Sequence, residues 1–92
     1  MSETRSFRLR VTGRVQGVGF RWHAREEARA LGVHGWVRNT PDGAVRAQVE
    51  GDSVAVDHLV TWFGQGPSGS RVDEVELQEA EVEGLRGFEI RR

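Results

Sequence analysis

The spacing of apolar side chains changes from a period of two to a helical period across a glycine-rich segment, and this change restricts the folds open to the chain. Before the segment, apolar and polar residues alternate from Ser6 to Thr12, which predicts a half-buried strand. From Phe20 onward the apolar residues fall on one helical face, namely Phe20, Ala24, Ala28 and Leu31. Gly32 stands where a helix C-terminal glycine is expected. The chain is therefore predicted to begin with a strand that leads through glycines directly into a helix.

The middle of the chain predicts a β-hairpin. Residues 33–39 form one strand candidate, and residues 44–50 alternate again between apolar and polar side chains. The four residues 40–43 between them read Thr-Pro-Asp-Gly, a turn sequence in which proline sets φ and glycine tolerates a positive φ. So short a connection joins the two strands antiparallel.

The second half of the chain predicts one more helix and two more strands. Asp52 or Ser53 can cap a helix whose apolar face carries Val56, Leu59, Val60 and Phe63. Residues 72–82 predict a strand, and an apparent shift of its inward face leads us to expect a β-bulge near Gln78. Residues 88–90 predict a short last edge strand.

The resulting order, β-α-β-β-α-β with an extra C-terminal strand, predicts an α+β fold of the ferredoxin-like, split βαβ type. Right-handed crossovers put both helices on one face of an antiparallel or mixed sheet. We expect residues 1–92 to form a single domain, since 92 residues suit one domain and no more. The first two strands run parallel in this arrangement, so Arg21 and Asn39 should meet at the edge where both strands end.

The composition excludes several kinds of chemistry. The chain contains no cysteine and no lysine, which removes disulfides, thiolate zinc sites, a cysteine nucleophile, Schiff-base chemistry and a Walker lysine. Any cation that binds an anion must be arginine or histidine. A net charge of −1 gives no global reason to bind nucleic acid or a membrane. Without a signal peptide or an apolar run of membrane-spanning length, a cytoplasmic protein is expected.

The glycine-rich segment is a candidate anion site. A loop that enters a helix N-terminus presents unpaired N–H groups and the positive end of the helix dipole. Arg21, in the first helical turn, adds a planar fork able to bind two phosphate oxygens. The competing interpretation of the segment is a tight strand–helix connection with a surface arginine. The competing interpretation of Asn39 is a turn cap.

Residues 13–21, Gly-Arg-Val-Gln-Gly-Val-Gly-Phe-Arg, closely resemble the signature of the acylphosphatase family. Residues 35–39, Gly-Trp-Val-Arg-Asn, followed by Asp42 and Gly43, resemble a second part of it. The resemblance implies an enzyme that hydrolyses the carboxyl–phosphate bond of acyl phosphates, with inorganic phosphate as product and inhibitor. It implies that Arg21 binds the phosphoryl group and that Asn39 orients the attacking water. It also implies a cradle of backbone amides from Gln16, Gly17, Val18, Gly19 and Phe20.

The sequence offers no plausible cluster of metal ligands beside the cradle and Arg21, so we expect no cofactor or metal, and we expect a monomer. The three histidines show no metal-ligand spacing. The three tryptophans, Trp22, Trp36 and Trp62, are expected in the core or at half-buried edges.

Three other functions stay open at this point. An RNA-binding module shares the element order, although residues 44–50 carry no aromatic side chain for base stacking. A regulatory domain of the same fold would bind an anion without turning it over. The chain would also suit an accessory domain of a larger carbamoyl-transfer protein.

Overall fold

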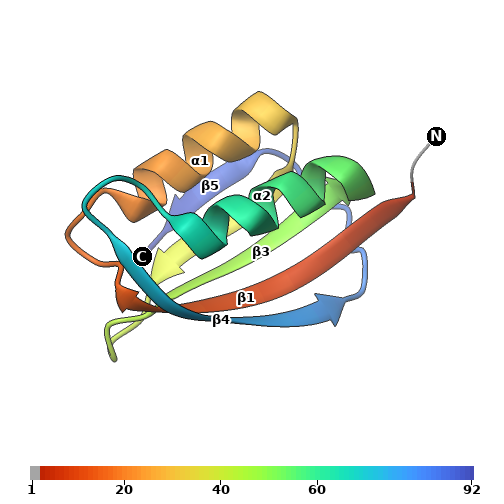
Figure 1. Ribbon diagram of the computed structural model, residues 1–92. Coiled ribbons are helices and arrows are strands. Elements are labelled where there is room, and N and C mark those ends of the chain that lie inside the picture. Colours follow the sequence, from red (N-terminus) through yellow and green to blue (C-terminus); the bar gives the residue numbers. More distant parts are fainter. Residues whose placement is uncertain (1–2) are drawn as a thin grey trace.

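The computed structural model describes residues 3–92 as two helices packed on one face of a five-stranded sheet (Figure 1). The elements are β1 (Thr4–Arg14), α1 (Phe20–Leu31), β2 (His34–Asn39), β3 (Val45–Asp52), α2 (Ser53–Gln65), β4 (Arg71–Ala80) and β5 (Phe88–Arg91). The strand order is β4-β1-β3-β2-β5, and only the β2–β5 pair is parallel. The predicted ferredoxin-like split βαβ fold is thereby confirmed.

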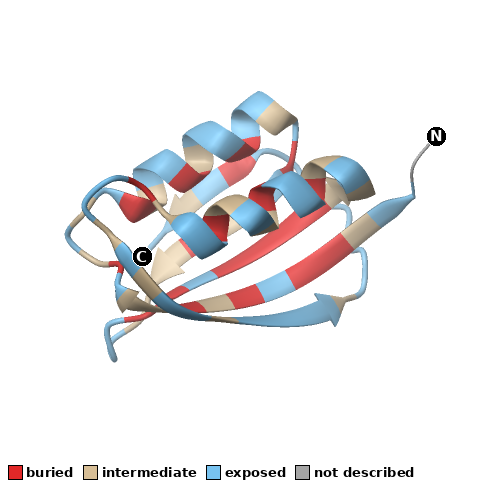
Figure 2. Ribbon diagram, in the orientation of Figure 1, coloured by how far each residue is buried: buried red, intermediate tan, exposed pale blue. Residues whose placement is uncertain are grey.

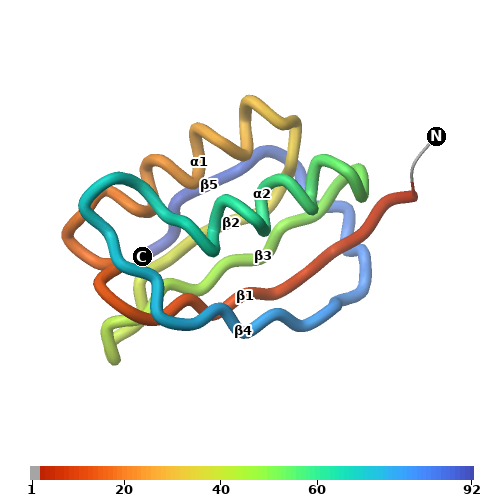
Figure 3. Tube along the Cα trace, in the orientation of Figure 1, coloured from red at the N-terminus to blue at the C-terminus, as the bar shows by residue number. Residues whose placement is uncertain are grey.

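The core lies between the helices and the sheet, where the buried residues of both layers face each other (Figure 2). The predicted inward faces of β1 and β3 are buried, as are Phe20, Ala24 and Ala28 on α1. Phe20 joins the two helices, because its ring centroid lies 5.2 Å from that of Trp62 and 5.7 Å from that of Phe63 on α2. Figure 3 shows the two helices side by side above the sheet. No helix within residues 3–92 is long and apolar enough to cross a membrane.

The helix ends have the expected caps. Gly32 ends α1 in the left-handed conformation with φ 70°, and its N–H donates to the carbonyls of Ala28 and Arg29. At the start of α2, the Asp52 carboxylate accepts a hydrogen bond of 3.2 Å from the Ala55 N–H. This contact decides between the two predicted capping residues in favour of Asp52.

The predicted β-bulge near Gln78 is wrong. Pairing with β1 runs without interruption from Ala80 to Glu74, and the register shifts only at Gly13, which faces Val72. Ala80 points to the sheet face away from the helices simply because it is an odd number of residues from Leu77. Gly13 adopts φ 128°, and a Cβ there would lie 2.1 Å from the Arg71 carbonyl oxygen, so the irregularity needs glycine.

The connection between β4 and β5 is anchored by a buried carboxylate. Glu50 is 3% exposed and accepts hydrogen bonds from the N–H groups of Glu83, Gly84 and Leu85 at 2.7–2.8 Å. Burial acts to raise the pKa of Glu50, and the three backbone donors more than offset it, so the pKa lies below its usual value. Glu50 thereby fixes the segment that leads into β5.

Candidate active site

A pocket of about 190 Å³ opens where β1 and β2 end, beside the start of α1. Arg21 and Asn39, 18 positions apart in sequence, both line it, as the parallel arrangement of β1 and β2 predicted. Its remaining lining residues are Val15, Gly17, Gly19, Phe20, Trp22 and Ile90. The loop, the helix start and the end of β2 lie at the same end of the sheet (Figure 1).

The loop and the helix N-terminus are shaped to expose backbone N–H groups. Gly17 and Gly19 have φ 74° and φ 76°, conformations that side-chain-bearing residues rarely adopt. Gly19 is the N-cap of α1 and has no side chain to satisfy the helix amides, and the first turn contains no acidic residue. Within residues 3–92, the N–H groups of residues 16–20 donate to no protein acceptor. They can therefore donate hydrogen bonds to an anion, and the helix dipole also favours a negative charge at this position.

His23 fixes the orientation of the Gly19 peptide. The Gly19 carbonyl accepts a hydrogen bond of 3.0 Å from the His23 backbone N–H, and the His23 Nδ1 lies 2.8 Å from the same oxygen. A carbonyl can only accept, so Nδ1 carries the proton in this contact. Both contacts hold the Gly19 oxygen toward the helix and away from an incoming anion.

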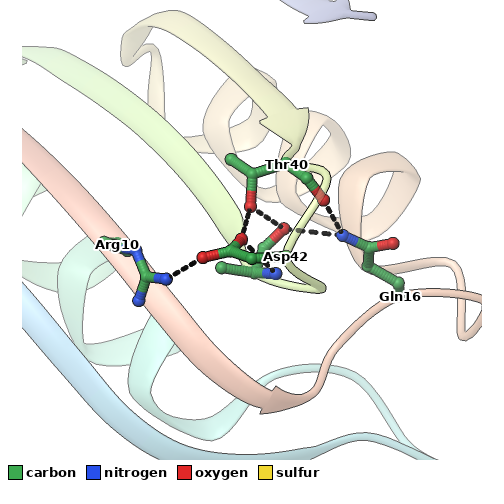
Figure 4. A network of polar contacts seen from close by, with 5 residues as sticks. Arg10, Gln16, Thr40 and Asp42 are labelled. Atoms are coloured by element: carbon green, nitrogen blue, oxygen red, sulfur yellow. Dashed lines mark hydrogen bonds and ion pairs between the residues drawn. The ribbon is translucent and has the colours of Figure 1, made fainter.

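Gln16 has a role that its place in the motif does not reveal. Its side-chain Nε2 donates 2.8 Å hydrogen bonds to the carbonyls of Thr40 and Ala44, which belong to the turn after Asn39 (Figure 4). The side chain therefore ties the glycine-rich loop to the end of β2. Because the two bonds link segments far apart in sequence, they fix the distance between the amide cradle and Asn39.

A second set of contacts stiffens the same turn. The Asp42 carboxylate accepts hydrogen bonds from the Thr40 hydroxyl and the Arg10 guanidinium, and one of 3.3 Å from the Ala44 N–H (Figure 4). The Thr40 hydroxyl, then Arg10 and the Ala44 N–H, lower the pKa of Asp42 to about 2. Asp42 is thus ionised near neutral pH, and its carboxylate ties Thr40, Arg10 and Ala44 together at the turn.

The structure places Trp22 differently from the sequence-based expectation, whereas Trp36 is half-buried as expected. Trp22 is 52% exposed and lines the pocket, so its expected place in the core or at a half-buried edge is wrong. Trp36 is half-buried on the face of the sheet opposite the helices and lies outside the pocket lining. Ile90 reaches the pocket because β5 pairs parallel with β2, a long-range pairing that the sequence pattern could not reveal. Trp22 carries a local signal, since it directly follows Arg21 in the first helical turn.

Titratable side chains are sparse around the pocket. Apart from Arg21, the residues that line it carry no ionisable side chain. Within residues 3–92, no group of three or more His, Asp or Glu side chains is placed to hold a metal ion. The arrangement can bind an anion through amides and a guanidinium and can orient a water molecule through a carboxamide.

Comparison with known proteins gives one consistent family. The family model described as Acylphosphatase matches residues 7–90. An acylphosphatase of Thermococcus kodakarensis is 58% identical over 82 residues, which cover 89% of this chain and 90% of the relative. The crystal structure of acylphosphatase from Bacillus subtilis superposes with a TM-score of 0.92 at 36% identity, covering 96% of this chain and 99% of that one. Full-length HypF contains a similar region, with a TM-score of 0.87 and 25% identity, that makes up 12% of its length.

Proposed function

The chain belongs to the acylphosphatase family and hydrolyses acyl phosphates to a carboxylate and inorganic phosphate, and we propose that Arg21 and Asn39 carry this reaction. In this proposal the backbone N–H groups of residues 16–20 and the Arg21 guanidinium bind the phosphoryl group. Asn39 holds the attacking water in line with the bond that breaks. The observation that supports it most directly is one pocket lined by Gly17, Gly19, Arg21 and Asn39 together.

The chemistry demands little beyond positioning and electrostatics. An acyl phosphate has a carboxylate as its leaving group, which departs without a proton from an acid. The transition state spreads charge over the phosphoryl oxygens, and preorganised N–H donors with a guanidinium stabilise that charge. The backbone fixes these donors before substrate binds, so they stabilise the phosphoryl charge without first having to be reoriented.

Asn39 is assigned to water orientation because its neutral carboxamide cannot act as a general base. Its carbonyl oxygen can accept a hydrogen bond from water while the substrate's own oxygens take the proton. Gln16 is a positioning residue in this scheme, since its contacts with Thr40 and Ala44 set where β2 ends relative to the cradle. Phosphate monoesters should be poor substrates, because their leaving groups need an acid that the pocket lining lacks.

The proposal extends to the setting of the reaction. We take residues 1–92 as one catalytic domain that acts as a monomer in the cytoplasm, on a small-molecule substrate, with no cofactor. The catalytic cycle engages neither nucleic acid nor a membrane. Charge neutralisation is assigned to Arg21 and the amides, so exhaustive chelation should leave benzoyl phosphate hydrolysis unchanged. Loss of activity that zinc or magnesium restores would contradict this mechanism.

Two substitutions test the two roles separately. Asn39→Ala should lower kcat strongly, by about 10²-fold or more, while the inhibition constant for phosphate changes little, because only water orientation is removed. Arg21→Ala should weaken both turnover and phosphate inhibition, and Arg21→Lys should restore little, since lysine lacks the planar fork.

The measurement is steady-state hydrolysis of benzoyl phosphate with phosphate as competing inhibitor, in wild type and the three variants. Arg29→Ala, on the exposed side of α1, serves as the control for loss of one positive charge. A near-normal kcat in Asn39→Ala would remove the proposed role of Asn39.

A further inference from the structure

The face of the sheet opposite the helices carries four arginines in one cross-strand row. Arg10 on β1 pairs in register with Arg46 on β3, Arg46 with Arg38 on β2, and Arg38 with Arg91 on β5. Neighbouring strands lie about 4.8 Å apart, so the row spans roughly 14 Å. Like charges placed directly opposite each other destabilise a sheet. The row shares no residue with the lining of the catalytic pocket, although Arg10 at one end of it contacts the Asp42 turn.

The row is only partly neutralised by carboxylates. Arg10 pairs with Asp42, and Arg91 pairs with Glu89 at 2.8 Å. Glu76 faces Arg10 across β1 and β4. Within residues 3–92, neither Arg38 nor Arg46 forms an ion pair with a carboxylate. The centre of the row therefore keeps an excess of positive charge.

A hollow of about 220 Å³ lies beside the centre of the row and combines charge with an aromatic ring. Its lining includes Arg8, Arg38, Arg46, Gln48 and Trp36. Arg38 and Arg46 also line a neighbouring hollow of about 280 Å³ over the β2–β3 turn. The guanidiniums of Arg38 and Arg91 lie 5.9 Å and 5.1 Å from the centroid of the Trp36 ring. Several guanidiniums beside an indole match a ligand that joins several phosphates to a flat aromatic group.

We propose that this open face is a second binding site, separate from the catalytic pocket, for a nucleoside polyphosphate. The phosphates bind Arg46, Arg38 and Arg8, and the base stacks on Trp36 in place of the Arg38 guanidinium, which leaves the ring to bind phosphate. Three arginines that form no ion pair within residues 3–92, Arg8, Arg38 and Arg46, converge on one hollow beside Trp36. Bound phosphates would neutralise the arginine charges and so relieve the like-charge repulsion along the row.

The test is calorimetric titration of the protein with ATP at about 50 mM salt. We expect one ATP site that survives in Arg21→Ala, where the catalytic cradle is weakened, and that loses at least tenfold in affinity in Arg46→Ala. Arg29→Ala should bind ATP within twofold of wild type. Arg46→Ala should also melt no lower than wild type, because it removes like-charge repulsion, and should hydrolyse benzoyl phosphate normally.

Further arms identify the ligand chemistry. Tripolyphosphate should bind at least fivefold more weakly than ATP, and Trp36→Leu should remove that difference. Equal affinities for ATP and tripolyphosphate in wild type would overturn the aromatic part of the proposal. Loss of ATP binding in Arg21→Ala with retention in Arg46→Ala would place the ligand in the catalytic pocket and overturn the second site. Absence of ATP binding at concentrations up to 1 mM would also overturn the second site, because three arginine–phosphate contacts are expected to give a Kd on the order of 1 mM. A 12-nucleotide oligothymidine that binds tighter than ATP, or a dimer that buries the face, would overturn the small-molecule assignment.

Discussion

At the scale of single residues, the proposed catalytic pocket is lined by two polar side chains and by several apolar ones. Arg21 and Asn39 supply the polar side chains, whereas Trp22 and Ile90 present apolar surface beside them. An acyl phosphate has the same two parts, a phosphoryl group and an acyl group. Once the phosphoryl group is bound in the cradle, the acyl group must leave the pocket past these apolar side chains. Trp22, 52% exposed in the protein, is therefore placed to select among acyl groups.

We predict that Trp22→Ala raises KM for benzoyl phosphate about three- to tenfold and changes KM for acetyl phosphate less than twofold. The reason is that an aromatic contact contributes about 0.5–1.5 kcal/mol, which an acetyl group is too small to gain. Trp22→Phe should keep most of the preference for the benzoyl substrate. Steady-state kinetics with both substrates measures the effect, and an equal loss on both would show that Trp22 does not contact the acyl group.

The positions of the two proposed catalytic residues were predictable from the sequence, whereas the positions of the residues around them were not. Arg21 and Asn39 could be placed together because parallel strands end at a common edge. Trp22 was misplaced because large aromatic residues are usually buried, and sequence position alone does not show that a helix start borders a pocket. The side-chain contacts of Gln16 with Thr40 and Ala44 depend on how far the loop folds back, which no local pattern specifies.

At the scale of elements, periodicity located every helix and strand within residues 3–92, and it misled at the edge strand β4. β4 is an edge strand, and Leu77 on it is 49% exposed although it pairs with the buried Leu9. Its pattern of apolar residues therefore reports burial poorly, which is why a bulge was expected near Gln78. The true irregularity at Gly13 follows from a close backbone approach across strands, and that is a tertiary effect.

The anchoring of the β4–β5 connection was also not predictable from the sequence. Its anchor, Glu50, is a buried acid in a strand whose apolar and polar residues alternate, so the sequence pattern predicts an exposed side chain there. We predict that Glu50→Gln lowers the free energy of unfolding at pH 7 by about 2–3 kcal/mol, since an amide cannot accept all three backbone bonds as an anion does. For a domain of this size that is a fall of roughly 10–20 °C in Tm. Glu81→Gln, exposed in the same connection, is the control and should change Tm little.

The pH dependence of stability gives an independent check on Glu50. Its pKa is lowered in the folded protein, so the unfolded chain binds the proton more tightly and stability rises with pH. The contribution is fully present above the unfolded pKa of about 4.3 and is lost as pH falls through the folded value. Urea unfolding between pH 6 and pH 3 should therefore show a shallower loss in Glu50→Gln than in wild type. Parallel curves for the two proteins would mean that the carboxylate is not ionised in its buried place.

At the scale of the whole molecule, the site combines segments from four parts of the chain on a sheet that exists only when the protein is folded. The loop after β1, the start of α1, the end of β2 and Ile90 of β5 all line the pocket. In the unfolded chain the amides of residues 16–20 and Arg21 have no fixed relation to one another. An anion that binds the cradle therefore binds the folded state alone, and binding must stabilise the fold.

We predict that inorganic phosphate raises Tm through this linkage. At ten times its Kd, phosphate adds about 1.4 kcal/mol to the free energy of unfolding, or roughly 5–10 °C for a domain of this size. Sulfate should act similarly, and chloride at the same ionic strength much less, which separates site binding from screening. Because the open-face arginines can also bind anions, the melts compare wild type with Arg21→Ala, Asn39→Ala and Arg46→Ala. Arg21→Ala should lose most of the shift, whereas Asn39→Ala and Arg46→Ala should keep it. An equal shift in wild type and Arg21→Ala would place phosphate elsewhere and remove the cradle as its site.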